Sequence, residues 1–195
     1  MVIGYHLIVT AYGFWLPNDP RGSWSTWVRA FEIYQAGGAA AKADTRRSVA
    51  GLTHDREQRA AAKAAMKFPA VRFDGRQAKA VGEGFGLAVK EGGYRVWACT
   101  VMPDHAHLVL GRHERTVERM RDHLKARGTF VLNRRGCHPL GGEASPWARK
   151  GWAVYLDDWA DVERAVRYVE GNPAKAGLRD QRWSFVKDWR DESRR

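Results

Sequence analysis

The chain has 195 residues, and 33 lysines and arginines against 22 aspartates and glutamates give it a formal net charge of +11. Hydrophobic residues make up 44% and charged residues 28%, which excludes a wholly disordered chain. The two cysteines, Cys99 and Cys137, stand far apart, which excludes a disulfide framework and a zinc finger and favours a reducing compartment. No apolar run approaches the roughly 18 residues of a membrane span, and residues 1–10 lack the features of a signal peptide, so we expect a cytoplasmic protein with no membrane partner.

The excess of positive charge indicates a polyanionic partner, and nucleic acid is the first candidate. Lysine and arginine gain affinity by releasing counterions from phosphates. A generally basic, soluble surface accounts for the same charge, because net charge bears on association and not on the fold. The charge alone leaves both interpretations open.

The N-terminal half predicts one strand and two helices. Residues 5–10 (YHLIVT) are rich in β-branched and aromatic residues and predict the first strand. The stretch 17–53 has no clear period and predicts a long loop or insertion. Thr53 or Asp55 is the expected cap of a helix through 57–66, which Pro69 ends. A second helix is expected over 77–90.

The next segments predict two strands and a basic helix. Residues 94–101 and 105–110 predict strands joined by a turn at 102–104. The helix that follows presents Val117, Met120 and Leu124 on one face. Its opposite face is basic, and it is either a track for phosphates or a solvated stripe. The bases over 112–135 are Arg112, Arg115, Arg119, Arg121, Lys125, Arg127, Arg134 and Arg135.

The C-terminal part predicts one more strand and one more helix. Residues 152–156 (WAVYL) predict the strand. A helix begins near 158–161, and its apolar positions Val162, Val166 and Val169 follow a helical period until the Gly-Asn-Pro run at 171–173 interrupts it. The remaining residues predict a basic tail without an evident core.

Two histidines stand one residue apart on the predicted strand over 105–110. Side chains alternate along a strand, so His105 and His107 share one face. Same-face neighbours lie roughly 6–7 Å apart at Cα, which two imidazoles can bridge to one cation at about 2.1 Å from each nitrogen. The pair is either a metal site or an incidental spacing. No comparable spacing supports a role for His6, His54, His113, His123 or His138.

Tyr168 and Asn172 lie four residues apart on the predicted C-terminal helix, and are therefore neighbours on one side of it. Beside a cation that also binds a phosphodiester, the Tyr168 hydroxyl could attack phosphorus and form a phosphotyrosine, with Asn172 as a neutral oxygen ligand. Structural alternatives stay open. Tyr168 also fits an amphipathic position at a core boundary, and Asn172 fits the N-cap of a short helix that begins at Pro173.

Two segments resemble one known family. Residues 101–110, VMPDHAHLVL, resemble the MPNHVHLL signature of the HUH single-tyrosine transposases, in particular the REP-associated tyrosine transposases. Residues 168–178, YVEGNPAKAGL, look like the YIxxNPxKAGL element that carries that family's nucleophile. The resemblance extends more weakly over 5–10, 123–136 and 183–185, so it covers most of the chain from about residue 5 to 186.

The resemblance implies a fold and a chemistry. The fold is α+β with a ferredoxin-like core, in which helices pack on a central antiparallel sheet. By motif position, His105, His107 and the side-chain amide of Asn172 are the implied metal ligands, and Tyr168 is the implied nucleophile. The implied reaction cleaves single-stranded DNA beside hairpins, leaves a 5′ phosphotyrosine and a free 3′ hydroxyl, and rejoins strands without ATP. The implied metal is Mg²⁺ or Mn²⁺, whereas imidazole ligands favour manganese or zinc over magnesium.

On this interpretation the chain is a single transposase domain over residues 1–195, with a long loop or insertion at about 17–53 and a basic tail from about 179. The expected partner is single-stranded DNA with REP-like hairpins, held by the basic helix and the tail; monomer and homodimer are both compatible with it. The expected DNA contacts are Arg112, Arg119, Lys125, Arg127, Arg134, Arg135 and Lys175.

Two departures from the family pattern and two rival functions remain. Asp104 stands where the family has asparagine and places a carboxylate near the metal, and the insertion exceeds the expected connection. A non-catalytic hairpin-binding protein derived from a transposase is the first rival, and the intact histidine pair and Tyr-x3-Asn spacing argue against it. A HIT-type nucleotide hydrolase is the second, but it needs a third alternating histidine where Val109 stands.

Overall fold

The computed structural model describes residues 1–43, 49 and 51–193. The chain divides into two compact units, of which one comprises residues 1–11 and 72–195 and the other residues 12–71. We call them the sheet unit and the inserted unit. The sequence predicted a single domain with a long loop or insertion at about 17–53. In the structure the segment 12–71 contains two helices that pack against each other, and it forms a unit of its own.

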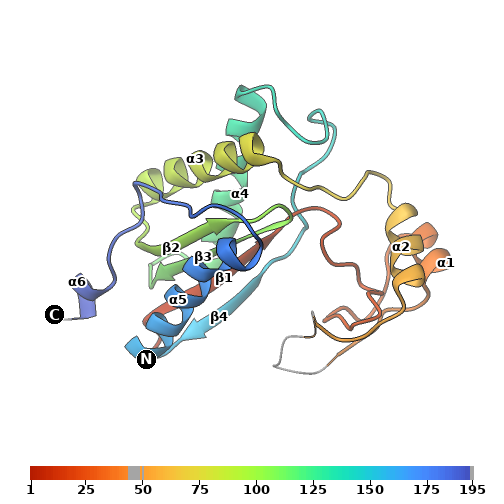
Figure 1. The fold of residues 1–195 in the computed structure, drawn as a ribbon, viewed down its shortest axis with the longest axis horizontal. Coiled ribbons are helices and arrows are strands. Elements are labelled where there is room, and N and C mark those ends of the chain that lie inside the picture. Colours follow the sequence, from red (N-terminus) through yellow and green to blue (C-terminus); the bar gives the residue numbers. More distant parts are fainter. Residues whose placement is uncertain (44–48, 50, 194–195) are drawn as a thin grey trace. The chain divides into compact units, whose positions relative to one another are not determined.

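The sheet unit is built on four antiparallel strands in the order β2-β3-β1-β4 (Figure 1). The strands are β1 (Gly4–Thr10), β2 (Val96–Val101), β3 (His105–Gly111) and β4 (Trp152–Leu156). Helix α3 (Gly75–Gly92) precedes β2, and α4 (Val117–Arg134) connects β3 to β4. This strand order and connectivity is that of a ferredoxin-like α+β fold, so the predicted fold class is confirmed.

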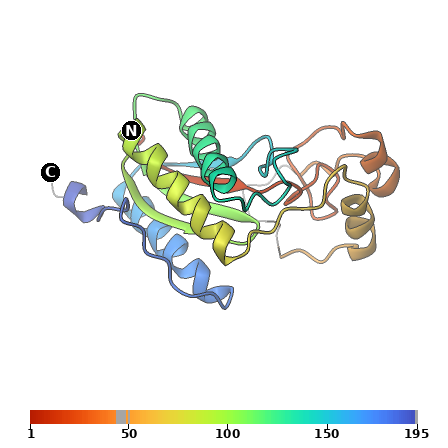
Figure 2. The ribbon, with the colours of Figure 1, turned by 90° about the horizontal axis from the view of Figure 1, so that it is seen from above.

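Helices cover both faces of the sheet. Figure 2 shows α3 and α4 on one face and α5 (Trp159–Lys175) on the other. The face under α3 and α4 is fully apolar, and Leu7 and Leu108 are buried there. On the opposite face, Val162 and Val166 of α5 pack against Val109 of β3. The period that predicted the helix therefore marks the side of α5 that contacts the sheet.

Helix α3 contains several glycines because neighbouring groups come very close to its backbone. A Cβ on Gly84 would lie 2.4 Å from the Arg127 carbonyl oxygen, so α3 and α4 cross at this residue. A Cβ on Gly82 would meet the Trp183 ring at 2.1 Å. Trp183 belongs to the C-terminal segment, for which the sequence predicted no core. The structure instead packs that segment on α3, and it ends in α6 (Arg190–Ser193).

Helix α5 continues through the Gly-Asn-Pro run that was expected to interrupt it. Pro173 lies inside the helix, which ends at Lys175. A proline removes one backbone donor and usually ends a helix, but here only two helical residues follow it. Asn172 is therefore a buried helical residue and not the N-cap of a new helix.

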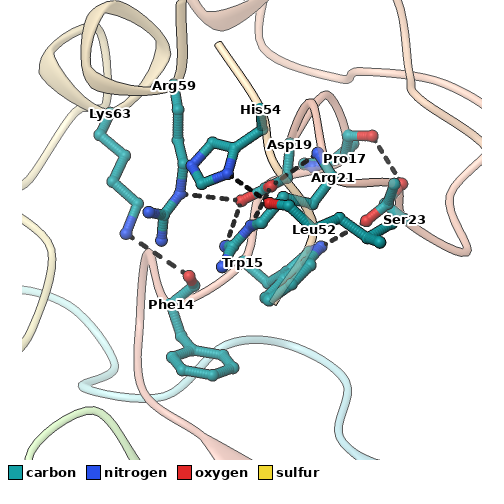
Figure 3. Close-up of polar contacts among 11 residues, drawn as sticks. Phe14, Trp15, Pro17, Asp19, Arg21, Ser23, Leu52, His54, Arg59 and Lys63 are labelled. Carbon is teal, nitrogen blue, oxygen red and sulfur yellow. Dashed lines mark hydrogen bonds and ion pairs between the residues drawn. The ribbon is translucent and has the colours of Figure 1, made fainter. Parts of the chain in front are cut away.

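The inserted unit contains α1 (Phe31–Gly37) and α2 (Arg56–Ala64), and Asp55 caps α2 as one of the two predicted caps. Its interior holds a polar network around the buried Asp19 (Figure 3). Arg21 donates two side-chain hydrogen bonds to this carboxylate, both of 2.8 Å, and its guanidinium lies 3.8 Å from the centre of the Trp15 ring. A buried carboxylate destabilises a fold unless it is paired with positive charge or hydrogen-bond donors. The pairing of Asp19 therefore favours the conformation in which its partners surround it, and this holds the irregular segment in place.

Among the described residues, no helix is both long enough and apolar enough to cross a membrane.

Candidate active site

Strand β3 carries two histidines on the sheet face that α5 covers. His105 and His107 alternate with the buried Ala106, and their ring centroids lie 4.7 Å apart. His107 is almost fully buried and His105 is half-buried. The two imidazoles are therefore adjacent, as the alternation along the strand predicted, and they lie at the beginning of β3.

A third histidine, His6, joins them from β1. The β1–β3 register pairs His6 with Val109, so its side chain projects on the same face as His107. The His6 Nε2 and His107 Nδ1 atoms lie 2.9 Å apart. Spacing along the sequence assigned no role to His6, because His6 lies beside His107 only through the register between two strands that are distant in sequence. A prediction that paired β1 with β3 could have found it.

Burial keeps these two imidazoles neutral. Loss of solvent lowers the pKa of His6 from 6.5 to about 4. For His107, burial first and then the neighbouring His105 and His6 lower the pKa to about 2. One proton therefore lies between His6 and His107. When His107 Nδ1 donates it to His6 Nε2, His107 Nε2 keeps a lone pair at neutral pH, and His6 carries its own proton on Nδ1.

Asp104 holds the other histidine. Its Oδ1 lies 2.7 Å from His105 Nδ1. Burial raises the pKa of Asp104, but the hydrogen bond from His105 and the charges of His105 and Arg72 outweigh it and lower the pKa below its usual value. An ionised Asp104 accepts the Nδ1 proton of His105, which fixes its tautomer with Nε2 as the ligand atom.

Tyr168 of α5 lies against the same group. Its ring centroid is 5.5 Å from that of His107 and 5.7 Å from that of His6. The residue is 47% exposed, so it is accessible from solvent. Lys175, one of the predicted DNA contacts, has its Nζ atom 5.1 Å from the centre of the Tyr168 ring. Residues from β1, β3 and α5, far apart in the sequence, therefore form one site.

Asn172 lies one helical turn beyond Tyr168. It is buried, and its Nδ2 atom has no hydrogen-bond partner among the described residues. The hydroxyl of Thr100, which is paired with His107 across β2 and β3, is a second buried polar atom without a partner there. Unpaired buried polar groups are costly and mark positions where a ligand or water completes the structure.

The donor set fits a divalent cation of the transition series. In the part of the chain that the structure describes, no group of three or more histidine, cysteine, aspartate or glutamate side chains is arranged to hold a metal ion. A cation on His105 and His107 would thus take its third protein ligand from another residue type. The side-chain oxygen of an asparagine is a ligand of that kind, and two imidazoles with one amide oxygen suit Mn²⁺.

Most of the predicted DNA contacts lie elsewhere in the sheet unit. Arg119, Arg127 and Arg134 belong to α4, on the sheet face opposite to α5 (Figure 2). Arg112 and Arg135 flank that helix, and Arg135 forms an ion pair with Glu83 of α3. The structure therefore does not bring these residues to Tyr168. Of the predicted contacts, it places Lys175 beside the site.

Lys125 requires a correction, because it does not belong to the exposed basic face. It is buried, and its Nζ atom donates hydrogen bonds to the carbonyl oxygens of Ala148, Arg149 and Lys150 at 2.9, 3.5 and 3.3 Å. Burial lowers its pKa to about 8. Its role is to anchor the segment before β4, and the helical period could not reveal this because the partner segment lies well beyond the helix in the sequence.

Part of the sheet face beside the site is open. The β1–β4 register pairs Val154 with His6 and Trp152 with Ile8, so both side chains project on the face of the histidines. Trp152 is 37% exposed and Val154 is 43% exposed. Aromatic and apolar surface of the edge strand β4 is therefore exposed on the same sheet face as the histidines.

Comparisons with known proteins were made at the level of sequence and of structure. No protein-family profile matches the sequence. No curated protein matches it. A solved structure that the chain resembles is that of a REP-associated tyrosine transposase bound to a REP hairpin, with 19% sequence identity and a TM-score of 0.44 over 62% of this chain and 70% of that one.

Proposed function

We propose that the protein is a metal-dependent endonuclease and strand transferase that cleaves single-stranded DNA beside hairpins and joins it again, with Tyr168 as the nucleophile. The observation that carries the proposal is the position of the Tyr168 ring, 5.5 Å from His107 and half exposed to solvent. The resemblance of both segments to the tyrosine transposase motifs supports the same function.

The chain's own residues account for the group transfer. The Tyr168 oxygen attacks the phosphorus of a phosphodiester, and the bond from phosphorus to the 3′ oxygen breaks. The tyrosine proton leaves to solvent, and the departing 3′ oxygen takes up a proton and becomes a hydroxyl. Because a phosphodiester is exchanged for a phosphotyrosine diester, no external energy source is needed, and a 3′ hydroxyl can reverse the step.

The group that would be bound here is a divalent cation, held by His105, His107 and Asn172. When bound, it supplies positive charge that neutralises the phosphate and makes phosphorus more electrophilic. Asp104 and His6 act on the histidines: each occupies the Nδ1 side of one imidazole, at 2.7 and 2.9 Å, and so directs the other nitrogen to the ligand position. The resemblance implies Mg²⁺ or Mn²⁺ and the imidazole donors favour manganese or zinc, so Mn²⁺ is compatible with both.

The DNA strand would approach over the open part of the sheet. Lys175 lies beside Tyr168 and offers a charge for the phosphate that is attacked. Trp152 lies on the same face, where a base can stack on it. The arginines of α4 on the opposite sheet face would bind a more distant part of the hairpin.

The test is incubation of the full chain with labelled single-stranded hairpin oligonucleotides and Mn²⁺ or Mg²⁺, followed by denaturing electrophoresis. We expect a protein-linked fragment with the wild type and none with Tyr168→Phe, which keeps the ring and removes the nucleophile. His105→Ala should lose the fragment as well. Cleavage retained in Tyr168→Phe would overturn the nucleophile, and hairpin binding without any adduct in either metal would favour a non-catalytic hairpin-binding protein.

A further inference from the structure

The inserted unit has a pocket whose lining is basic. The lining residues come from one face of α2 and from the segment before it, and they are His54, Arg56, Arg59, Ala60 and Lys63. Positions 56, 59, 60 and 63 follow a helical period, so their side chains project from the same side of α2. No carboxylate lines this pocket among the described residues, which makes it a site for an anion and not for a cation.

A buried carboxylate positions Arg59 at the pocket. Asp19 accepts a hydrogen bond of 3.1 Å from Arg59 Nε, while Arg21 already binds the same carboxylate through Nε and Nη2 (Figure 3). Two guanidinium groups therefore share one negative charge, and the cluster keeps a net positive charge. Because its Nε is held, the Arg59 guanidinium has a fixed orientation, which is the geometry that phosphate recognition requires.

His54 adds a second observation. Its Nδ1 atom lies 2.9 Å from the Leu52 carbonyl oxygen. Its Nε2 atom is buried and has no hydrogen-bond partner among the described residues. In Figure 3 the His54 ring lies beside the Arg59 side chain. His54 lines the pocket, and Nε2 is the ring nitrogen that a ligand bound there would pair with.

The same unit exposes aromatic side chains, which distinguishes a nucleic acid from a free anion. Four aromatic residues on or before α1 are at least half exposed, with exposed fractions of 59% for Trp24, 59% for Trp27, 65% for Phe31 and 50% for Tyr34. The Arg29 guanidinium lies 5.1 Å from the centre of the Trp27 ring. Basic groups that bind phosphates together with aromatic rings that stack on bases are the combination used for single-stranded nucleic acid.

We propose that the inserted unit binds single-stranded DNA, with a backbone phosphate in the pocket formed by His54, Arg56, Arg59 and Lys63. The proposal rests on the proposed function for the identity of the nucleic acid. It makes the inserted unit a second DNA-binding element, separate from the site that carries Tyr168.

The test compares two double variants of the full chain that remove the same charge. Arg56→Gln with Lys63→Gln changes the pocket, and Lys42→Gln with Lys67→Gln changes bases of the same unit outside it. Binding of a fluorescent hairpin oligonucleotide is followed by anisotropy in the presence of a chelator, over a series of salt concentrations. We expect the pocket variant to bind the oligonucleotide more weakly than the wild type does. The slope of log affinity against log salt concentration should also be shallower, by about 0.7 for each phosphate that the pocket no longer neutralises. The control variant should keep the wild-type salt dependence.

Equal losses in the two double variants would overturn the proposal, because they would mean that diffuse charge alone attracts DNA. Inorganic phosphate forms the second arm of the experiment. Phosphate could raise the melting temperature of the wild type and not that of the pocket variant, while the two proteins bind DNA with the same affinity. That result would show a site for free phosphate and would overturn the DNA proposal. Adduct formation by Tyr168 is measured separately, so its absence would refute the proposed function and leave the anisotropy comparison valid.

Discussion

The hydrogen bond between His6 and His107 gives the sharpest prediction about the proposed metal site. His6→Ala removes the partner of His107 Nδ1, which lies 2.9 Å away on a side chain that is 4% exposed. His107 then has no neighbour that fixes its proton and its ring orientation, and water has little access to replace it. Loss of such a supporting hydrogen bond lowers metal affinity by about 10- to 100-fold. This range corresponds to about 1.4–2.7 kcal/mol of binding free energy.

The assay is a titration of the full chain with Mn²⁺, followed by the electron paramagnetic resonance signal of the free ion. His113→Ala is the matched control, because it removes another imidazole of the same unit that contacts Tyr94 and not the site. His6→Gln should recover part of the affinity, since its amide can also pair with His107. Unchanged affinity in His6→Ala, with affinity abolished in His105→Ala, would refute the positioning role of His6.

Three further predictions concern DNA, acid and helix packing. Trp152→Ala should weaken single-stranded DNA binding by about 1–3 kcal/mol, measured by anisotropy, whereas Tyr155→Ala on the other sheet face should not. Burial lowers the pKa of His6 from 6.5 to about 4, so the unfolded chain binds a proton at this residue more readily than the folded protein does. The free energy of unfolding, measured with urea, should therefore fall by up to about 3 kcal/mol as the pH drops from 6.5 to about 4. The decrease should be smaller in His6→Gln. Gly84→Ala should lower the free energy of unfolding by about 1–3 kcal/mol, because the new methyl group clashes with a backbone carbonyl of α4. Gly75→Ala should not, because no atom of the described residues lies near its Cβ position.

Local periodicity was enough to predict the elements that carry the site. Strand alternation placed His105 and His107 together, and helical spacing placed Tyr168 beside Asn172. Each inference needed only residues that are close in sequence. The fold class was predicted from the resemblance of residues 101–110 and 168–178 to the tyrosine transposase motifs, which implies a ferredoxin-like core.

Features that depend on distant pairing could not be predicted in this way. His6 lies beside His107 because of the register between β1 and β3. Lys125 is buried, and not part of the exposed basic face, because it binds backbone carbonyl groups of the segment 148–150. The sequence predicted the helix over 77–90, but it could not show that the glycines of α3 make room for Trp183 and the backbone of α4. The sequence also predicted an insertion at about 17–53 and the helix that became α2, but it could not predict the buried ion-pair network around Asp19 that orders the irregular part.

Mass spectrometry of the reaction products is the decisive test of whether Tyr168 forms a covalent bond to DNA. The full chain is incubated with Mn²⁺ and an unlabelled hairpin oligonucleotide, and the adduct is digested with nuclease and protease. We expect a phosphodiester-linked nucleotide on the peptide that contains Tyr168, and no such peptide in Tyr168→Phe. An adduct on any other residue, or strand cleavage with no protein-linked product, would contradict the proposal.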